Sequence, residues 1–139
     1  MASAASDFNQ QVIDEFRANS GVVGGPFSGM PLLILHHRGA KSGEERVSPL
    51  AYLEDGGRYA LFATKGGAPT NPGWYHNLTA HPEVTVELGG DEFRARAEEV
   101  MGEERDRLYG AQAQRRPQFA EYERNTTRKI PVIVLTPLG

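Results

Sequence analysis

Apolar residues recur at two different spacings along the chain. Near the start, Phe8, Val12, Ile13 and Phe16 fall at helical intervals, which predicts an amphipathic helix with one apolar stripe within residues 1–20. From Pro31 onward, short apolar runs alternate with turn residues, a pattern typical of β-strands. The Gly-rich stretch 21–29 stands between the two regions and predicts a connecting loop.

Six segments after Pro31 have the length and texture of strands. Residues that tolerate a positive φ stand at Glu54–Gly57 and Gly89–Asp91, so each of these turns most simply closes an antiparallel hairpin. Apolar and polar side chains alternate in the second hairpin, which gives it one wet face. Six such strands favour a small barrel. We expect the strands at 32–37, 47–53, 58–64, 83–88, 92–100 and 130–136.

Two further helices are expected. Asn71 can cap a helix and Pro72 suits its first position, so one helix is predicted from there to about Leu78. Another begins with acidic residues after Gly102 and ends at the arginines before Pro117, in keeping with the helix macrodipole. The fold class is therefore expected to be mainly β (α+β): one domain over residues 1–139, a barrel of about six antiparallel strands with flanking helices.

Composition narrows the classes of protein that remain. The chain has 139 residues, 39% of them hydrophobic and 24% charged, as in an ordinary globular domain. It has no cysteine, which excludes disulfides, thiolate metal sites and cysteine nucleophiles. The first seven residues lack the features of a signal peptide, so we expect a cytoplasmic protein. The first helix is expected to be dispensable for the barrel. Its stripe can serve a greasy substrate or the inner membrane face, or it can pack on the sheet.

Charge is distributed unevenly. Residues 31–80 carry five Lys/Arg against four Asp/Glu, residues 81–109 carry four against nine, and residues 110–139 carry five against two. An anionic small molecule would prefer the first and last of these stretches. The chain is not basic enough to indicate a nucleic-acid partner.

Three segments could carry chemistry. The segment 37–46 holds Arg38, Lys41 and Arg46 with two glycines and can cradle an oxyanion, although charged hairpin tips are often merely solvated. The segment 64–72 runs from a strand end to a helix N-terminus beside Lys65, or is a plain loop. Trp74 can wall a flat ring or pack in the core. The four histidines form no ligand set, and no metal is expected.

These segments together resemble the deazaflavin-dependent nitroreductase family. The likeness covers nearly the whole chain, and its most specific part is the block Trp74-Tyr75-His76-Asn77-Leu78 preceded by Lys65-Gly66-Gly67. The resemblance implies a split β-barrel of the FMN-binding type that binds coenzyme F420, an 8-hydroxy-5-deazaflavin with an anionic tail. The matching segments are 38–43, 46–50, 64–67, 71–78 and 122–133.

The resemblance also implies roles for individual residues. Arg38, Lys41, Ser42 and Arg46 would meet the tail and phosphate, and Lys65, Gly66 and Trp74 would lie nearer the deazaflavin. The other implied coenzyme-binding residues are Ser48, Pro49, Thr64, Gly67, Pro72 and Asn77.

The implied reaction passes hydride from the reduced coenzyme to a quinone or nitro-aromatic acceptor. Thr64 and Tyr122 are the candidate catalytic hydrogen-bond donors. Alternatively, Thr64 caps the end of a strand and Tyr122 is a half-buried helix residue. His76 is expected to orient its helix through a hydrogen bond.

The chain departs from the family pattern in places. Ala40 stands where another cation is common, and Thr64 where serine is frequent. Phe119, Tyr122 and Asn125 stand where some members carry several tyrosines, which argues against reduction of bulky nitroimidazoles. An FMN-dependent enzyme of the same barrel type and a non-catalytic deazaflavin carrier remain alternative functions, and the oligomeric state is left open.

Overall fold

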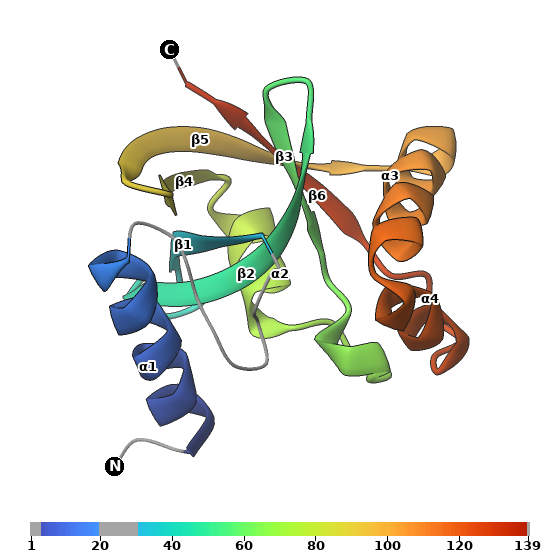
Figure 1. The fold of residues 1–139 in the computed structure, drawn as a ribbon, viewed down its shortest axis with the longest axis horizontal. Helices are drawn as coiled ribbons and strands as arrows, with labels where there is room; N and C mark the ends of the chain where they lie inside the picture. The colour runs from blue at the N-terminus through green and yellow to red at the C-terminus, as the bar shows by residue number, and fades with distance from the viewer. Residues whose placement is uncertain (1–3, 20–30, 139) are drawn as a thin grey trace.

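The computed structural model describes residues 4–19 and 31–138, so the expected loop at 21–29 lies outside the described residues. Six antiparallel strands form a closed barrel in the order β1-β2-β3-β6-β5-β4 (Figure 1). The barrel closes because β1 pairs with both β2 and β4. This confirms the expected six-stranded architecture. The strands are β1 (Leu32–Arg38), β2 (Glu45–Asp55), β3 (Arg58–Phe62), β4 (Glu83–Leu88), β5 (Asp91–Val100) and β6 (Val132–Pro137).

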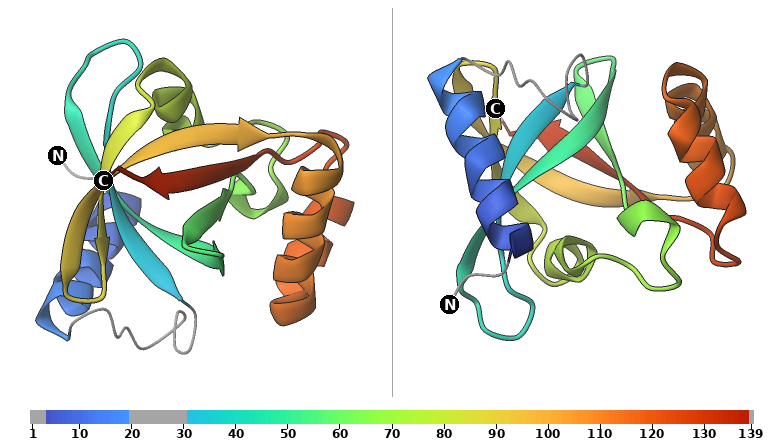
Figure 2. Two further views of the ribbon diagram at one scale, coloured as in Figure 1. Left: turned by 90° about the horizontal axis from the view of Figure 1, so that it is seen from above. Right: turned by 60° about the horizontal axis from the view of Figure 1, so that its bottom comes forward.

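The helices lie outside the barrel, on different sides of it. Figure 2 shows α1 beside β1 and β2, and α3 with α4 together at the other end of the molecule. No helix in the described ranges is long and apolar enough to cross a membrane. The helices are α1 (Ala4–Ala18), the short 3-10 helix η2 (Lys65–Gly67), α2 (Gly73–Ala80), α3 (Gly102–Arg115) and α4 (Pro117–Arg124).

Strands covered by a helix are apolar on both faces. Along β6, Ile133 and Leu135 join the core inside the barrel, whereas Val132 and Val134 join a second core formed with α3 and α4. On β3, Phe62 belongs to this second core and meets Phe119 of α4 with ring centroids 5.7 Å apart. An uncovered strand such as β5 shows the alternation expected of one wet face.

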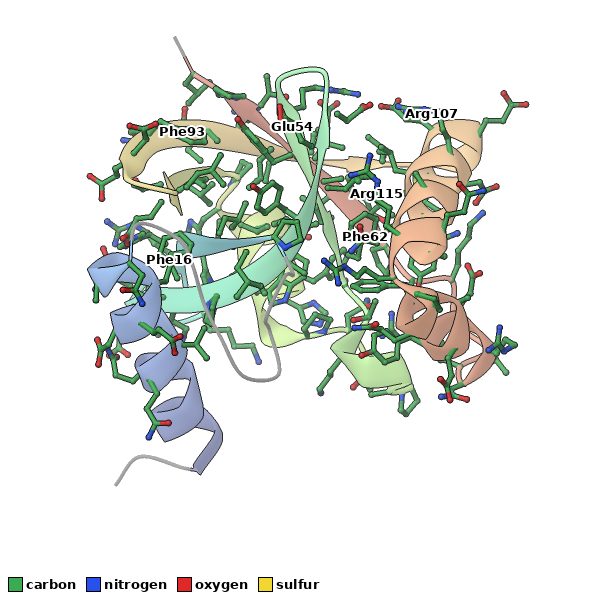
Figure 3. The ribbon with its side chains drawn as sticks, viewed as in Figure 1. Phe16, Glu54, Phe62, Phe93, Arg107 and Arg115 are labelled. Carbon is green, nitrogen blue, oxygen red and sulfur yellow. The ribbon has the colours of Figure 1, made fainter. Side chains whose placement is uncertain are left out.

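The apolar stripe of α1 packs against the barrel. Val12, Ile13 and Phe16 are buried in one cluster with Leu32 and Ile34 of β1 (Figure 3). The side chain of Phe8 lies outside what the structure describes. Of the alternatives for this helix, packing on the sheet is the one observed. Its buried side chains are not presented to a membrane surface in this arrangement.

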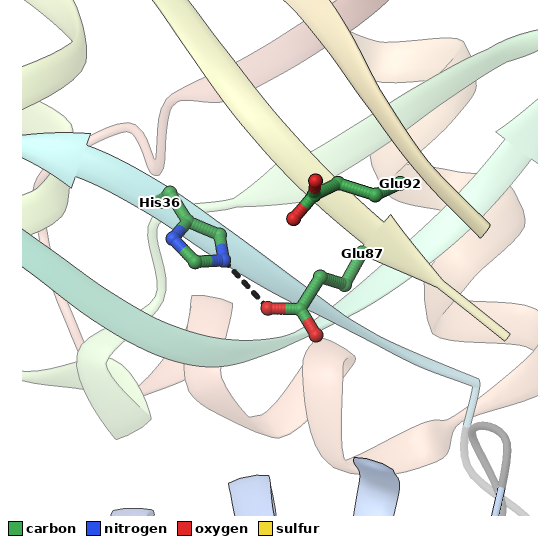
Figure 4. A group of neighbouring side chains, drawn as sticks. All are labelled: His36, Glu87 and Glu92. Atoms are coloured by element: carbon green, nitrogen blue, oxygen red, sulfur yellow. Dashed lines mark hydrogen bonds and ion pairs between the residues drawn. The ribbon is translucent and has the colours of Figure 1, made fainter. Parts of the chain in front are cut away.

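A salt bridge completes the attachment of α1. Both carboxylate oxygens of Glu87 on β4 accept from the guanidinium of Arg17, at 3.0 and 2.7 Å. His36 Nε2 lies 2.5 Å from the same carboxylate, and Glu92 is nearby (Figure 4). The Arg17 hydrogen bond is the main cause that lowers the pKa of Glu87. A cation bound by these three side chains would have to displace Arg17, so we describe the group as a polar anchor for α1.

Several element boundaries differ from those expected. The third strand ends at Phe62 rather than Thr64, and the last begins at Val132 rather than Ile130. Helix α2 begins at Gly73 with Pro72 in the cap position, so the prediction that Asn71 caps it is wrong. The Asn71 side chain instead accepts a hydrogen bond from Arg128. The bounds of helix α4 were not predicted, because Pro117 was expected to end the preceding helix, whereas it occupies the first turn of α4.

Candidate functional site

The tip of the β1–β2 hairpin is folded by its own backbone. Gly39 donates to the carbonyl of Glu44, and Gly43 donates back to the carbonyl of Gly39, each at 2.9 Å. A Cβ atom added to Gly39 would lie 2.5 Å from Ser42 Oγ, closer than real Cβ contacts come. The absence of a side chain at Gly39 therefore lets the tip bring Ser42 and the neighbouring Lys41 over the end of the barrel.

A cleft of about 630 Å³ lies between this hairpin and α2. We call it the hairpin cleft. Strand β2 contributes Arg46 and Ser48, and α2 contributes Trp74 and Asn77, so residues far apart in sequence converge on one hollow. The remaining lining residues are His37, Gly39, Ala40, Lys41, Ser42, Gly73 and His76.

The cations at the hairpin cleft have no carboxylate partners in the part of the chain that the structure describes. Lys41 and Arg46 are both exposed, and neither forms a salt bridge within the described residues. By contrast, Arg58 and Arg107 both pair with Asp55 on another part of the surface. Charges that are not neutralised within the protein remain available to an anionic ligand.

A chain of hydrogen-bonded polar groups lines the hairpin cleft, with His37 and Asn77 buried at its centre. The backbone N–H of Ala40 donates to Asn77 Oδ1 at 2.8 Å, Asn77 Nδ2 lies 2.9 Å from His37 Nδ1, and His37 Nε2 lies 3.0 Å from Ser48 Oγ. His37 and Asn77 are 4% and 8% exposed. Burial, aided by the nearby charge of Arg46 and by His36, lowers the pKa of His37 to about 4. The imidazole is therefore neutral near pH 7.

The connection from β3 to α2 is held in place by Arg128. Its guanidinium donates to the carbonyls of Ala63, Thr64 and Ala68 and to Asn71 Oδ1, at 2.8–3.1 Å. Desolvation lowers the pKa of Arg128, and the four acceptors compensate for the water that the guanidinium loses.

Lys65 lies within this connection with φ of 46°. That is the left-handed region, which costs a residue with a side chain roughly 1–2 kcal/mol. The hydrogen bonds of Arg128 on both sides of Lys65 offset that cost. Lys65 Nζ donates to Thr70 Oγ1 at 3.2 Å and forms no salt bridge within the described ranges.

Helix α4 packs against η2, within the connection from β3 to α2. Gly67 has a φ of +86°, and a Cβ atom there would lie 3.0 Å from the Tyr122 carbonyl oxygen, so glycine suits this close approach between η2 and α4. The Tyr109 hydroxyl on α3 donates to the Phe119 carbonyl at 2.6 Å and fixes α4 in turn. Phe119 and Trp74 both line a second hollow.

This second hollow, which we call the aromatic cleft, has a volume of about 230 Å³. Trp74 lines both clefts, so the two hollows adjoin at this side chain. The other residues around the aromatic cleft are Pro49, Leu50, Ala51, Phe62, Thr64, Lys65, Pro72 and Phe119. Aromatic walls of this kind suit a flat ring.

Most of the expected site residues meet at these two clefts. Lys41, Ser42, Arg46, Ser48 and Asn77 line the hairpin cleft, Pro49, Thr64, Lys65 and Pro72 line the aromatic cleft, and Trp74 lines both.

The remaining expected residues do not line either cleft. Arg38 donates to the Gly43 carbonyl within the hairpin tip. Gly66 and Gly67 shape the connection, and the Tyr122 ring packs against Phe119 with centroids 5.4 Å apart. Tyr122 is a partly buried helix residue, which is the alternative that the sequence left open for it.

Two residues at the site were not assigned a role from the sequence. His37 looked like one of four scattered histidines, and its burial depends on α2, which comes 35 or more positions later in the chain. Arg128 lies in the segment 122–133 that resembles the family, but no role was assigned to its side chain. No local pattern marks either residue, because each acquires its role from long-range contacts.

Comparison with known proteins identifies relatives over most of the chain. A model of the family described as F420H(2)-dependent quinone reductase matches residues 9–137. An F420H(2)-dependent quinone reductase from Mycobacterium tuberculosis (strain ATCC 25618 / H37Rv) is 38% identical over 125 residues, which is 87% of this chain and 84% of that protein.

Two solved structures agree with this match. One, an F420-H2 dependent reductase, superposes with a TM-score of 0.70 at 40% identity over 76% of this chain and 93% of its own. The other, described as a domain-swapped dimer, has a TM-score of 0.71 at 36% identity over 91% and 92% of the two chains.

Replacing Arg128 should loosen the β3–α2 connection. In Arg128→Ala, three carbonyls and the Asn71 side chain lose a charged donor, so the free energy of unfolding should fall by about 2–4 kcal/mol. Amide hydrogen exchange of residues 63–71 should accelerate. Arg128→Lys should recover only part of the loss, because a lysine lacks the planar fork. The exposed Arg124→Ala is the matched control. Unchanged exchange in Arg128→Ala would show that the connection holds without this side chain.

Proposed function

The chain belongs to the F420H(2)-dependent quinone reductase family, and on that premise we propose that the two clefts bind reduced coenzyme F420 and present it to a quinone. The protein is then an oxidoreductase whose cofactor is coenzyme F420 and whose substrate is a small oxidised molecule. The observation that carries the proposal is the junction of two unlike hollows at Trp74, one lined by exposed cations and one with aromatic walls.

The residues present fit this coenzyme. Lys41 and Arg46 are exposed cations at the hairpin cleft and have no carboxylate partner among residues 4–19 and 31–138, as an anionic tail requires. Phe62, Trp74 and Phe119 surround the aromatic cleft, as a tricyclic ring requires. A charge-assisted hydrogen bond contributes roughly 1.5–3 kcal/mol, so a few of them account for much of the ~8 kcal/mol of micromolar binding.

Reduced coenzyme F420, when bound, supplies a hydride to the acceptor. The protein's own part is to orient the ring between the aromatic walls and to exclude water from them. A quinone that receives hydride gains charge on an oxygen, and a hydrogen-bond donor beside that oxygen lowers the barrier.

Thr64 and Tyr122 are the proposed donors to the acceptor oxygen. Thr64 lines the aromatic cleft, so its hydroxyl is the nearer of the two proposed donors. Tyr122 does not line the aromatic cleft but packs against Phe119, which does, so we propose that its hydroxyl serves an acceptor that extends past the Phe119 ring. His76 lines the hairpin cleft rather than the aromatic one and has no part in this step.

Nitro-aromatic compounds are a second proposed class of acceptor, because the same hydride donor and flat cleft suit them. The chain is similar to a structure described as a domain-swapped dimer, and self-association is accordingly part of the proposal for this protein. A cytoplasmic location also remains a proposal. We do not propose a membrane role for α1, since Val12, Ile13 and Phe16 are buried against the barrel.

The proposed activity has a direct optical test. Purified protein mixed with oxidised coenzyme F420 or with FMN should change the absorption and fluorescence of the deazaflavin only, and menadione should reoxidise reduced F420 in its presence. Binding without reoxidation would indicate a carrier instead of a reductase. A preference for FMN would favour the alternative FMN-dependent function and end the proposal.

Removing two cations should weaken coenzyme binding. Lys41→Ala combined with Arg46→Ala should raise the Kd for F420 about 10-fold or more, and should flatten the salt dependence of binding because exposed charges act through screened Coulomb forces. Fluorescence titration between 50 and roughly 500 mM salt measures both effects. The control is Arg124→Ala with Lys129→Ala, which removes two exposed cations outside the clefts. If both double variants behave alike, the hairpin cleft is not the tail site.

The two proposed donors can be tested without disturbing the clefts. Thr64→Val and Tyr122→Phe each keep the shape of the side chain and remove a hydroxyl. Each should lower kcat for menadione by about 10- to 1,000-fold, the upper part matching the loss of one oxyanion donor. The Kd for F420 should stay within about twofold. If a variant keeps the kcat of the parent protein, the substituted residue has no part in the mechanism. If it loses only affinity for the coenzyme, the residue belongs to the binding site.

A further inference from the structure

The orientation of the Asn77 amide is fixed by a backbone group. The N–H of Ala40 can only donate, and it lies 2.8 Å from the side chain of Asn77. The atom that faces it must therefore be the amide oxygen. It follows that the NH₂ group of Asn77 faces His37 Nδ1, at 2.9 Å.

This orientation determines where His37 carries its proton. An NH₂ group can only donate, so His37 Nδ1 must accept and cannot bear a hydrogen. The imidazole is neutral because burial lowers its pKa to about 4. Its single proton is therefore on Nε2, which lies 3.0 Å from Ser48 Oγ and donates to it.

The hydroxyl hydrogen of Ser48 is consequently left free. Ser48 Oγ already accepts from His37, so its own hydrogen must point elsewhere. No other partner for this hydroxyl exists among residues 4–19 and 31–138. Ser48 lines the hairpin cleft, which gives the free hydrogen an open direction.

We propose that Asn77 and His37 are positioning residues that hold Ser48 Oγ as a hydrogen-bond donor toward an anionic oxygen in the hairpin cleft. The inference rests on the proposed function, which places the coenzyme's tail there. The oxygen belongs to the phosphate or to a carboxylate of that tail. His37 and Asn77 act through Ser48 and through the hairpin backbone.

The charges around His37 must allow this arrangement. Burial is the main cause that lowers the pKa of His37, and Arg46 and His36 lower it further. They oppose the imidazolium form and so preserve the single Nε2 proton. The charged or titratable residues that share a hollow with His37 are His36, Arg38, Lys41, Glu45, Arg46, His76, Glu83 and Arg94.

The substitution Asn77→Asp should reverse the proton chain. A carboxylate still accepts from Ala40, but its second oxygen requires a hydrogen on His37 Nδ1. In the neutral imidazole, Nε2 then becomes an acceptor and turns the Ser48 hydrogen inward. At low pH the imidazolium has hydrogens on both nitrogens, and Ser48 again donates to the cleft.

Coenzyme binding should therefore acquire a pH dependence that the parent protein lacks. The Kd of Asn77→Asp for F420, divided by the parent value, should rise from near 1 at low pH to about 10 at high pH. Ser48→Ala should show an increase of about 10-fold at every pH. It should leave unchanged the binding of the deazaflavin chromophore without its phosphate and glutamate tail.

The charge of the new carboxylate also acts on an anion, so a double variant separates the two effects. In Asn77→Asp combined with Ser48→Ala, the pH dependence from the Ser48 donor should vanish, because no hydroxyl remains to reorient. If the double variant keeps the full pH dependence of Asn77→Asp, simple repulsion explains it and the proposal fails.

Nitrogen-15 NMR of the histidine rings tests the same chain with no coenzyme present. His37 in the parent protein should show the neutral Nε2–H tautomer near pH 7, and in Asn77→Asp the Nδ1–H tautomer at high pH. An Nδ1–H tautomer in the parent protein would overturn the inference. Because this readout needs no ligand, it remains decisive if F420 fails to bind, an outcome that would count against the proposed function alone. Circular dichroism shows whether Asn77→Asp folds. If it does not fold, Ser48→Ala still tests whether the Ser48 hydroxyl contributes to coenzyme binding.

Discussion

The pairing of β1 with β4 is the constraint on which the rest of this structure depends. Three register positions, from Ile34 opposite Glu87 to His36 opposite Thr85, join the first strand to the fourth and close the sheet. Closure removes the exposed edges that an open sheet would present. It also brings the β1–β2 hairpin next to α2, the helix that precedes β4. The interior is filled with aliphatic side chains, so the clefts lie outside the barrel, where the hairpin, α2 and α4 come together.

Arginine and lysine side chains serve two different purposes around this site. Arg128 has lost part of its hydration and is compensated by four protein acceptors, so it acts as a structural fastener of the β3–α2 connection. Lys41 and Arg46 keep their contact with water and have no carboxylate partner in the described ranges. Their exposure costs little because water solvates them. The sequence alone cannot distinguish these two kinds of cation, because the difference lies in their surroundings in the folded chain.

Sequence reasoning predicted what local chemistry determines. The turns at Glu54–Gly57 and Gly89–Asp91 close hairpins as expected, because a positive φ is a property of the turn residues themselves. Local rules failed where one residue can play two different structural roles. Pro117 can end one helix or occupy the first turn of the next, and in the structure it does both within two residues. Asn71 met the rule for a cap, yet its side chain is taken by Arg128, 57 positions away.

Asn77 shows why a site of this kind cannot be divided into separate contributions. Its amide oxygen holds the hairpin tip through the Ala40 N–H, and its NH₂ group faces His37. On the proposed proton chain, a tip that moved away from α2 would remove the group that orients the amide, and with it the constraint on the His37 proton. A ligand that orders the tip would then order the Ser48 donor as well. The energies of these contacts are coupled through one side chain and should not add, so the placement of the hairpin is itself part of the binding chemistry.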